Sequence, residues 1–598
     1  MTSKGIQDVS GDIISLYRAK LAREKGAVRK EWGGRLSIAL VYPNHYRIGM
    51  SNLGFQIVYH LFNKRSELVA ERVFLPEGRE MSLYVQSGKR LLSLETQTPL
   101  QNFDLVAFSL SFENDYPNIL KILELAKIPL IAEERSDPCP LIMAGGITAF
   151  LNPEPLAAFI DFFLLGEAEA NLNEFIDVFS ELRHQCANRA EALRTLAKGV
   201  PSLYVPSLYQ PEYYSDGILK SFLPKEDRIP EKIQVARYMP EEGMDMQIPL
   251  SVVTTPDTEF GDKVLIELAR GCGRSCRFCA AGYVYRPPRL HPERDIRKSV
   301  LSGIERCGQV GLLAAAVSDV PGIEDLTSGI VENGGRFSVS SLRADSITQG
   351  LLDNLKQAGQ RTVSIAPEAG SERLRRVINK HLTQEQITGA VRLISRIEDF
   401  AIRLYFLVGL PTETSNDIAE LVDLVKAIKH HMVKEATPRG KMGQIRLSVN
   451  CFVPKASTPF QWFPLENMSS LREKQKRIRK ALVRQGGIKV NFDVPKWAYV
   501  QTLLSLGDRR VGSILLTAHK LDGNWTKALR FSDVNPDFFV YRPKGLDEVL
   551  PWDFIDNGIL KEHLTREYKL ALKEEESDVC RVGECNRCGV CGHLEKME

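Results

Sequence analysis

The 598-residue sequence lacks a membrane-spanning apolar run, an excess of charge of either sign, internal repeats and low-complexity tracts. Apolar runs such as the one that begins at Leu156 are interrupted, here by Asp161, well before the roughly 20 residues of a span. The residues after Met1 contain no apolar core of a signal peptide, so we expect a cytoplasmic protein without a membrane span. The 78 Lys and Arg nearly balance the 75 Asp and Glu, so the net charge of +3 favours neither nucleic acid nor an anionic membrane as a partner.

Cysteine is also scarce, at 11 residues, yet seven of the eleven fall into two tight groups, which suits a reducing compartment better than a disulfide framework. The first group is Cys272, Cys276 and Cys279, spaced C-x3-C-x2-C after a strand-like run that begins at Val264. Three thiolates on one short loop can hold three irons of a 4Fe-4S cluster and leave the fourth iron open for a small molecule. Zinc would need a fourth ligand close by, and the next cysteine, Cys307, is distant in the chain. We therefore predict an oxygen-sensitive iron–sulfur site.

The second group lies near the C-terminus and has the spacing C-x4-C-x2-C-x2-C. Four thiolates within a dozen residues form a complete coordination shell, which indicates a metal site without naming the metal. An auxiliary iron–sulfur cluster and a tetrahedral zinc ion both remain open. The four predicted ligands are Cys580, Cys585, Cys588 and Cys591.

Short apolar strands alternate with helical segments twice along the chain, which predicts an α/β protein with two such domains. The first alternation resembles a doubly wound, Rossmann-like domain, and the second contains six strand–helix units, the last strand beginning at Ile445. The expected organisation is a helical lead-in (1–35), the Rossmann-like domain (36–200), a linker (201–260), a partial barrel (261–490), an α-rich region (491–575) and the four-cysteine tail (576–598).

The pattern C-x3-C-x-aromatic-C, with Phe278 in the aromatic place, resembles the signature of the radical S-adenosylmethionine (SAM) enzymes. That resemblance implies a partial (β/α)6 barrel whose active site lies at the C-terminal mouth of its strands. It also implies that the open iron binds SAM and that an electron from the cluster cleaves it to a 5′-deoxyadenosyl radical. A reducing partner such as flavodoxin or ferredoxin would supply the electron.

Residues at successive strand ends are the predicted SAM pocket. By the resemblance, Ser318 and Asp319 receive the amino group of the methionine moiety, and the loop at Val408 and Gly409 brackets adenine. The Arg343 guanidinium can pair with the SAM carboxylate in a bidentate geometry. After the fourth strand, the Glu368 carboxylate can accept from the ribose hydroxyls, and Gly370 and Ser371 can begin the next helix.

The first domain resembles the cobalamin-binding-type domain that precedes the barrel in many radical SAM enzymes. Aligned on Gly49, the family's cobalt-ligating motif D-x-H-x-x-G has Tyr46 where its histidine belongs, and His45 is one residue out of register. Since one residue reverses side-chain direction on an extended segment, we do not expect a histidine ligand to cobalt. Cobalamin without such a ligand, and a domain that no longer binds it, both remain open. The residues expected to line a pocket at the strand ends are Ser109, Ser111, Gly145 and Gly146.

The whole chain resembles an uncharacterised radical SAM family with a cobalamin-type N-terminal domain and a four-cysteine tail. We predict a radical SAM enzyme that modifies an unidentified substrate. The alternatives are a cobalamin-dependent methyltransferase, a methylthiotransferase-like enzyme acting on RNA or protein, and a non-enzymatic iron–sulfur redox sensor that binds RNA. A basic stretch from Leu471 to Arg484 is expected to be a solvated helix that buries Leu471, Ile478 and Leu482, rather than a phosphate-binding face.

Overall fold

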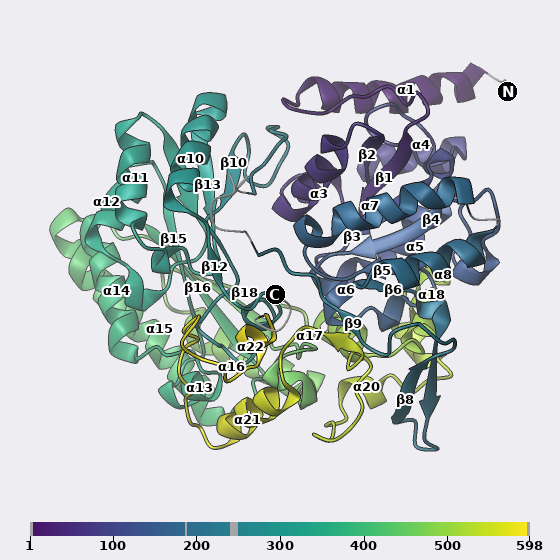
Figure 1. Cartoon of the computed structure of the whole chain (residues 1–598). Helices are drawn as coiled ribbons and strands as arrows, with labels where there is room; N and C mark the ends of the chain where they lie inside the picture. The colour runs from purple at the N-terminus through teal and green to yellow at the C-terminus, as the bar shows by residue number, and fades with distance from the viewer. Residues whose placement is uncertain (1–3, 186–187, 240–248, 595–598) are drawn as a thin grey trace.

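The computed structural model describes residues 4–185, 188–239 and 249–594. Figure 1 shows an N-terminal α/β domain in purple and blue beside a larger α/β domain in teal and green, with the yellow C-terminal region along the lower side. The predicted α/β fold class is confirmed, including two parallel-sheet domains and a helical C-terminal region. Among the described helices, none has the length and hydropathy that a membrane span requires.

The N-terminal sheet has the strand order β2-β1-β3-β4-β5-β6, in which only β6 is antiparallel to its neighbour. Strands β1 and β2 are buried along their whole length because helices cover both faces. The order 2-1-3-4-5 reverses direction between β1 and β3, which is where doubly wound sheets bind ligands. The strands are β1 (Leu36–Tyr42), β2 (Leu68–Phe74), β3 (Leu105–Ser109), β4 (Leu141–Gly145), β5 (Phe162–Leu164) and β6 (Leu203–Tyr204). The helices are α2 (Tyr46–Gly49), α3 (Leu53–Lys64), α4 (Gly78–Ser87), α5 (Tyr116–Ala126), α6 (Ile147–Leu151), α7 (Ala168–Gln185) and α8 (Arg189–Gly199).

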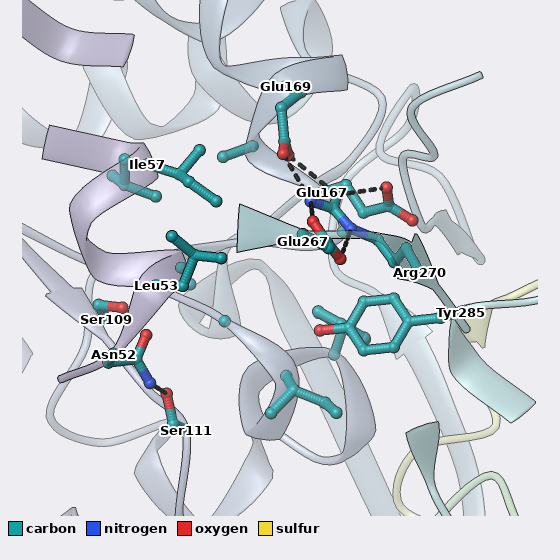
Figure 2. Close-up of a pocket in the computed structure, with 18 of the residues that line it drawn as sticks. Asn52, Leu53, Ile57, Ser109, Ser111, Glu167, Glu169, Glu267, Arg270 and Tyr285 are labelled. Carbon is teal, nitrogen blue, oxygen red and sulfur yellow. Dashed lines mark hydrogen bonds and ion pairs between the residues drawn. The ribbon is translucent and has the colours of Figure 1, made fainter. Parts of the chain in front are cut away.

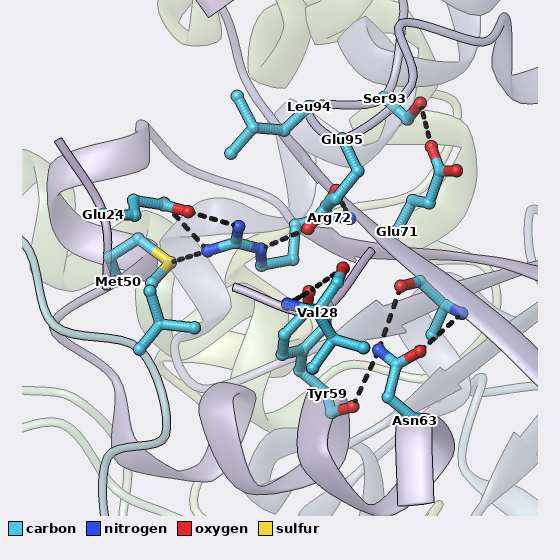
Figure 3. Close-up of polar contacts among 12 residues, drawn as sticks. Glu24, Val28, Met50, Tyr59, Asn63, Glu71, Arg72, Ser93, Leu94 and Glu95 are labelled. Carbon is cyan, nitrogen blue, oxygen red and sulfur yellow. Dashed lines mark hydrogen bonds and ion pairs between the residues drawn. The ribbon is translucent and has the colours of Figure 1, made fainter. Parts of the chain in front are cut away.

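The helical lead-in α1 (Lys4–Ala22) and the segment after it are fixed to this domain by a buried ion cluster. Arg72 on β2 is fully buried and pairs with Glu24 at 2.6 Å and with Glu95 at 2.7 Å (Figure 3). Its guanidinium also lies over the Tyr59 ring. Because a buried charge is costly without partners, this arrangement holds the lead-in in one position on the sheet.

The second domain contains the six predicted parallel strands in two sheets, β10-β13-β14 and β15-β16-β17-β18, which a bridge between Leu342 and Ile365 connects. Strand β18, with the sequence IKVNF, is an additional seventh strand at the sheet edge that the six-unit prediction did not include, and it is only partly buried. The strands are β10 (Val264–Glu267), β13 (Gln309–Leu313), β14 (Arg336–Val339), β15 (Thr362–Glu368), β16 (Ala401–Val408), β17 (Ile445–Cys451) and β18 (Ile488–Phe492). The helices are α9 (Ala281–Val284), α10 (Glu293–Cys307), α11 (Ile323–Glu332), α12 (Gln349–Gln357), α13 (Glu372–Val377), α14 (Gln384–Ile397), α15 (Ser415–Ala436) and α16 (Met468–Leu482).

The C-terminal region contacts both domains. Asn152 in the N-terminal domain donates to the backbone carbonyls of Ser505 and Gly507, and Arg509 pairs with Glu154. The segment between the domains carries a hairpin, β7 (Tyr209–Tyr213) with β8 (Leu219–Pro224), and β9 (Ile233–Gln234), which pairs with β19 (Ile555–Asp556). Part of the expected linker, 240–248, lies outside the described residues. The C-terminal helices are α17 (Pro495–Leu506), α18 (Val511–Lys520), α19 (Trp525–Arg530), α20 (Asp537–Val540), α21 (Lys561–Leu572) and α22 (Val590–Leu594).

Candidate active site

The first cysteine group occupies a loop at the carboxyl end of β10, between two short antiparallel strands, β11 (Ala269–Arg270) and β12 (Arg289–Leu290). Arg277, inside the triplet, is fully buried, and its guanidinium donates to the carbonyls of Arg376 and Val377. The Asn379 side chain donates to the Ser275 carbonyl at 3.1 Å. The loop is therefore held by the end of helix α13 and cannot move independently of the barrel.

The three thiols lie within electrostatic range of one another and of two cations. Burial raises the pKa of Cys276 and that of Cys279, the latter to about 12; the charge of Cys276 adds to the effect at Cys279, and the charge of Cys272 adds to it at both. The positive charges of Lys380 and Arg343 oppose this effect at Cys276. Thiolates in such a site need a compensating positive charge, which iron supplies, so the donor set fits a cluster. Nowhere in residues 4–185, 188–239 and 249–594 do three His, Cys, Asp or Glu side chains converge as ligands of a single ion would.

The structure brings the predicted residues of the second and third strand ends into one polar network. The Ser318 hydroxyl accepts from the Arg343 backbone N–H at 3.1 Å, and Asp319 accepts from Arg274 at 2.8 Å. Arg343 itself donates twice to Asp345 at 3.0 Å. Burial alone would raise the pKa of Asp345, but both arginines hold it below its usual range. Arg274, inside the cysteine triplet, is a residue that the sequence reading missed.

Glu368 lies at the end of β15 in a left-handed backbone conformation (φ 65°), and its carboxylate faces Lys380 at 3.4 Å. Ser371 begins helix α13, accepting from the Leu374 N–H, and its hydroxyl donates to Asp417. Gly370 contacts helix α15 so closely that an added Cβ would lie 2.2 Å from the Leu421 Cα. The structure therefore places Glu368 among the charged groups near the cysteines, and Gly370 and Ser371 in the packing behind them.

Of the remaining predicted pocket residues, Phe278 lies on the cysteine loop, and Val408 and Gly409 lie at the end of β16. Phe278 is partly buried against a small apolar cluster that includes Ala369, Leu410 and Phe452. Val408 is fully buried, and the Gly409 N–H donates to the Glu413 carboxylate at 2.9 Å. Phe278 therefore links the cysteine loop to an apolar surface beside the strand ends.

A cavity of about 580 Å³ lies at the reversal point of the N-terminal sheet and extends to the cysteine loop of the barrel. Ser109, Ser111, Gly145 and Gly146 all line it, as the sequence reading expected of a strand-end pocket. Gly146 has a φ of 105°, and an added Cβ would lie 2.3 Å from the Leu110 carbonyl oxygen, so only glycine fits there. From the barrel side the lining comprises Glu267, Ala269, Arg270, Gly271, Ala281, Tyr285, Leu313, Ala314, Ala315 and Ser340.

The residues that line the cavity include no histidine. His45 instead contacts the Leu75 carbonyl, and Tyr46 is buried with its hydroxyl donating to Glu24. Asn52, at the start of α3, donates to the Ser111 hydroxyl at 3.1 Å and presents its amide to the cavity (Figure 2). The cavity wall is mainly apolar with a few amide and hydroxyl groups, which is typical of cofactor sites.

Three carboxylates and one arginine join the two domains at the cavity edge (Figure 2). Arg270, which directly precedes the cysteine loop, donates to Glu167 at 2.8 Å, to Glu169 at 2.7 Å and to Glu267 at 2.9 Å. Arg289 also pairs with Glu167. The sequence reading missed this cluster, although Glu167 and Glu169 follow strand β5 directly, where the strand-end rule would have found them.

The four-cysteine tail lies directly on the cysteine loop of the barrel. The Cys580 N–H donates to the Gly273 carbonyl at 2.7 Å, and the Leu560 N–H donates to the Cys588 carbonyl at 3.0 Å. Burial and the charges of the other three tail cysteines raise the pKa of Cys580. The positive charge of Arg286 lowers the pKa of Cys580.

Comparisons with known proteins match both domains. The family model for the N-terminal domain of radical SAM proteins matches residues 54–206, and the model for the radical SAM superfamily matches residues 266–425. An uncharacterised protein of Methanocaldococcus jannaschii is 29% identical over 80% of this chain and 90% of its own length. A tRNA-2-methylthio-N(6)-dimethylallyladenosine synthase of Desulforamulus reducens is 24% identical over 39% of this chain. The match covers 55% of that enzyme, so this chain spans about half its length.

Two solved structures are similar in outline. The radical SAM methyltransferase TsrM from Kitasatospora setae has a TM-score of 0.42 and 15% identity over 69% of this chain and 72% of its own. The cobalamin-dependent SAM radical enzyme OxsB has a TM-score of 0.42 and 14% identity over 90% of this chain and 79% of its own. Because the two matched families together reach from the N-terminal sheet through the cysteine loop into the barrel, this chain belongs to the radical SAM superfamily, whose enzymes use a 4Fe-4S cluster and SAM.

Proposed function

We propose that this enzyme cleaves SAM at a 4Fe-4S cluster held by Cys272, Cys276 and Cys279, and that cobalamin occupies the cavity for methyl transfer to an unidentified substrate. The observation that carries the proposal is the cavity, which connects the ligand-binding edge of the N-terminal sheet to the residues on either side of the cysteine loop. When bound, the cluster supplies the electron that cleaves SAM, and cobalamin supplies a carrier for the methyl group.

The polar network at the strand ends supports a SAM pocket beside the cysteines. In this proposal the Arg343 guanidinium pairs with the SAM carboxylate, and Asp319 accepts from its amino group. Glu368 accepts from the ribose hydroxyls, while Phe278 and the Val408–Gly409 loop pack beside adenine. Lys380 and Arg274 compensate the negative charge of the loop.

The absence of a histidine from the cavity wall supports cobalamin held without a protein imidazole on the metal. Asn52, Ser109 and Ser111 offer amide and hydroxyl groups for hydrogen bonds, and Gly145 and Gly146 at the end of β4 line the same cavity. The carboxylates at the cavity edge disfavour a polyanionic occupant, which separates this cavity from a phosphate-binding site.

Filling the cavity tests this proposal. Leu53→Trp places an indole in the cavity wall at the start of α3, whereas Lys64→Trp adds the same group at the exposed end of that helix. After anaerobic purification with cobalamin supplied, we expect about one corrinoid per chain in the wild type and in Lys64→Trp, and several-fold less in Leu53→Trp. A wild-type protein that binds SAM and iron but retains no corrinoid would overturn the cobalamin assignment.

Methylthiolation of RNA or protein is the second candidate, because relatives that match 37–39% of this chain include a tRNA methylthiolating synthase and a ribosomal protein methylthiotransferase. A second iron–sulfur cluster in the tail together with an empty cavity would favour it. In either case we propose a cytoplasmic enzyme that takes its electron from a flavodoxin or ferredoxin.

A further inference from the structure

The tail and the barrel's cysteine loop are in direct contact, although they lie far apart in the sequence. The Cys580 N–H donates to the Gly273 carbonyl at 2.7 Å. The contact is close enough that a Cβ added to Gly273 would lie 3.1 Å from the Cys580 carbonyl oxygen. One peptide hydrogen bond therefore separates a ligand of the tail site from the residue next to Cys272.

A buried arginine makes a second connection. Arg286 is 2% exposed, and its guanidinium donates to the Ser275 hydroxyl at 2.8 Å and contacts His563 Nε2 at 3.2 Å. Arg286 also lines one small cavity together with Cys580, Cys585 and Cys588 of the tail. A cation beside the cysteine sulfurs stabilises the reduced form of an iron–sulfur cluster, because reduction adds negative charge.

Buried polar contacts fix the two segments relative to each other. Arg277, inside the barrel's cysteine triplet, pairs with Glu567 at 3.2 Å and donates to the Glu575 carbonyl at 2.8 Å. The Ser577 hydroxyl donates to the same Glu567 carboxylate at 2.7 Å, and the Ser577 backbone N–H donates to the Asn379 side-chain oxygen at 2.9 Å. Since Arg277 and Glu567 are both almost fully buried, the distance between the two cysteine groups is set by the fold.

The opposite side of the tail faces solvent. The side chains of Arg581 and Glu584 are each 72% exposed, and Arg587 is 46% exposed. The tail therefore lies between the protein surface and the barrel's cysteine loop, which is where an electron from a protein donor would enter.

We infer that the tail cysteines hold a second iron–sulfur cluster and that this cluster passes electrons from a protein donor to the SAM-binding cluster. The inference rests on the proposed function. For each SAM cleaved, a reduced flavodoxin- or ferredoxin-type protein loses one electron, the tail cluster accepts it, and the barrel cluster receives it. No proton or atom moves in this transfer. A structural zinc ion is the competing occupant.

The double substitution Cys585→Ser/Cys591→Ser removes two tail ligands, and Cys307→Ser on α10 is the matched control outside both cysteine groups. We expect about eight irons per reconstituted wild-type chain and about four in the double variant. Production of 5′-deoxyadenosine is then measured with reduced flavodoxin and, separately, with dithionite, a small reductant that diffuses to either cluster. We expect the ratio of the flavodoxin-driven to the dithionite-driven rate to fall at least tenfold in the double variant and to stay unchanged in Cys307→Ser.

A second variant distinguishes loss of electron transfer from misfolding of the tail. Arg286→Gln keeps the seven cysteines of the two groups and removes the positive charge beside the tail sulfurs. We therefore expect both clusters to assemble and the reduction potential of the tail cluster to shift to a more negative value. Zinc in the wild-type tail, or an unchanged rate ratio after loss of four irons, would overturn the relay. If the wild type holds eight irons but cleaves no SAM with either reductant, the proposed function fails instead.

Discussion

The ion cluster at Arg270 leads to a stability prediction that depends on pH. Arg270→Met keeps most of the apolar stem of the side chain but removes the charge that Glu167, Glu169 and Glu267 share. These carboxylate side chains are 4%, 15% and 15% exposed, so solvent compensates little for the loss. Breaking a buried pair by removing one partner costs about 3–5 kcal/mol, and Arg289, which still pairs with Glu167, favours the lower end.

The pH dependence follows from the carboxylates. Burial alone would raise the pKa of Glu267, but His291 and Arg270 lower it to about 2. A carboxylate with a depressed folded-state pKa stabilises the fold above its unfolded pKa of about 4.3, and this contribution is lost as the pH falls toward 2. Without Arg270 the folded-state pKa of Glu267 is higher than in the wild type, so Glu267 takes up a proton at a higher pH and the penalty becomes smaller as the pH falls. The cost of Arg270→Met is therefore larger at pH 8 than at pH 5.

Urea unfolding at the two pH values measures this cost, with fluorescence reporting the transition in which the N-terminal domain separates from the barrel. Arg194→Met is the control, because Arg194 forms an exposed pair with Glu226 and such pairs contribute about 1 kcal/mol or less. A cost below about 1 kcal/mol for Arg270→Met at pH 8, or the same cost at pH 5, would refute the reasoning.

Three further predictions concern single residues. Cys276→Ala should lose the barrel cluster and form no 5′-deoxyadenosine above background, measured by iron analysis and chromatography; wild-type yield in this variant would contradict the cluster assignment. Gly370→Ala should destabilise the barrel by about 1–3 kcal/mol in urea unfolding because its Cβ would overlap helix α15, whereas Gly389→Ala, which meets no atom within 4 Å, should not. Lys544 is buried, and desolvation lowers its pKa to about 7, so the folded state binds fewer protons than the unfolded state between pH 7 and about 10.4. Lys544→Met should therefore raise the melting temperature at pH 7 by more than at pH 10, and an equal rise at both would contradict this.

Local patterns predicted most of the fold because they depend on neighbours in the sequence. The six barrel strands and the inward positions of the basic helix were found from hydrophobic periodicity, and Leu471, Ile478 and Leu482 on α16 are fully buried. The edge strand β18 was missed although its sequence IKVNF alternates apolar and polar residues, which is the pattern of a half-buried strand. The strand-end rule placed Ser109 and Gly145 in a cavity because the carboxyl ends of parallel strands meet at one edge.

The sequence by itself determined that three thiols share one short loop, because their spacing along the chain is the same in any fold; that they hold the cluster is our prediction. It also determined that Tyr46 replaces the expected histidine. Only the tertiary structure decided that Arg270 joins three carboxylates across two domains and that Cys580 lies on Gly273. These contacts join segments far apart in the chain, and their closeness follows from the packing of whole domains, which no local pattern of residues encodes.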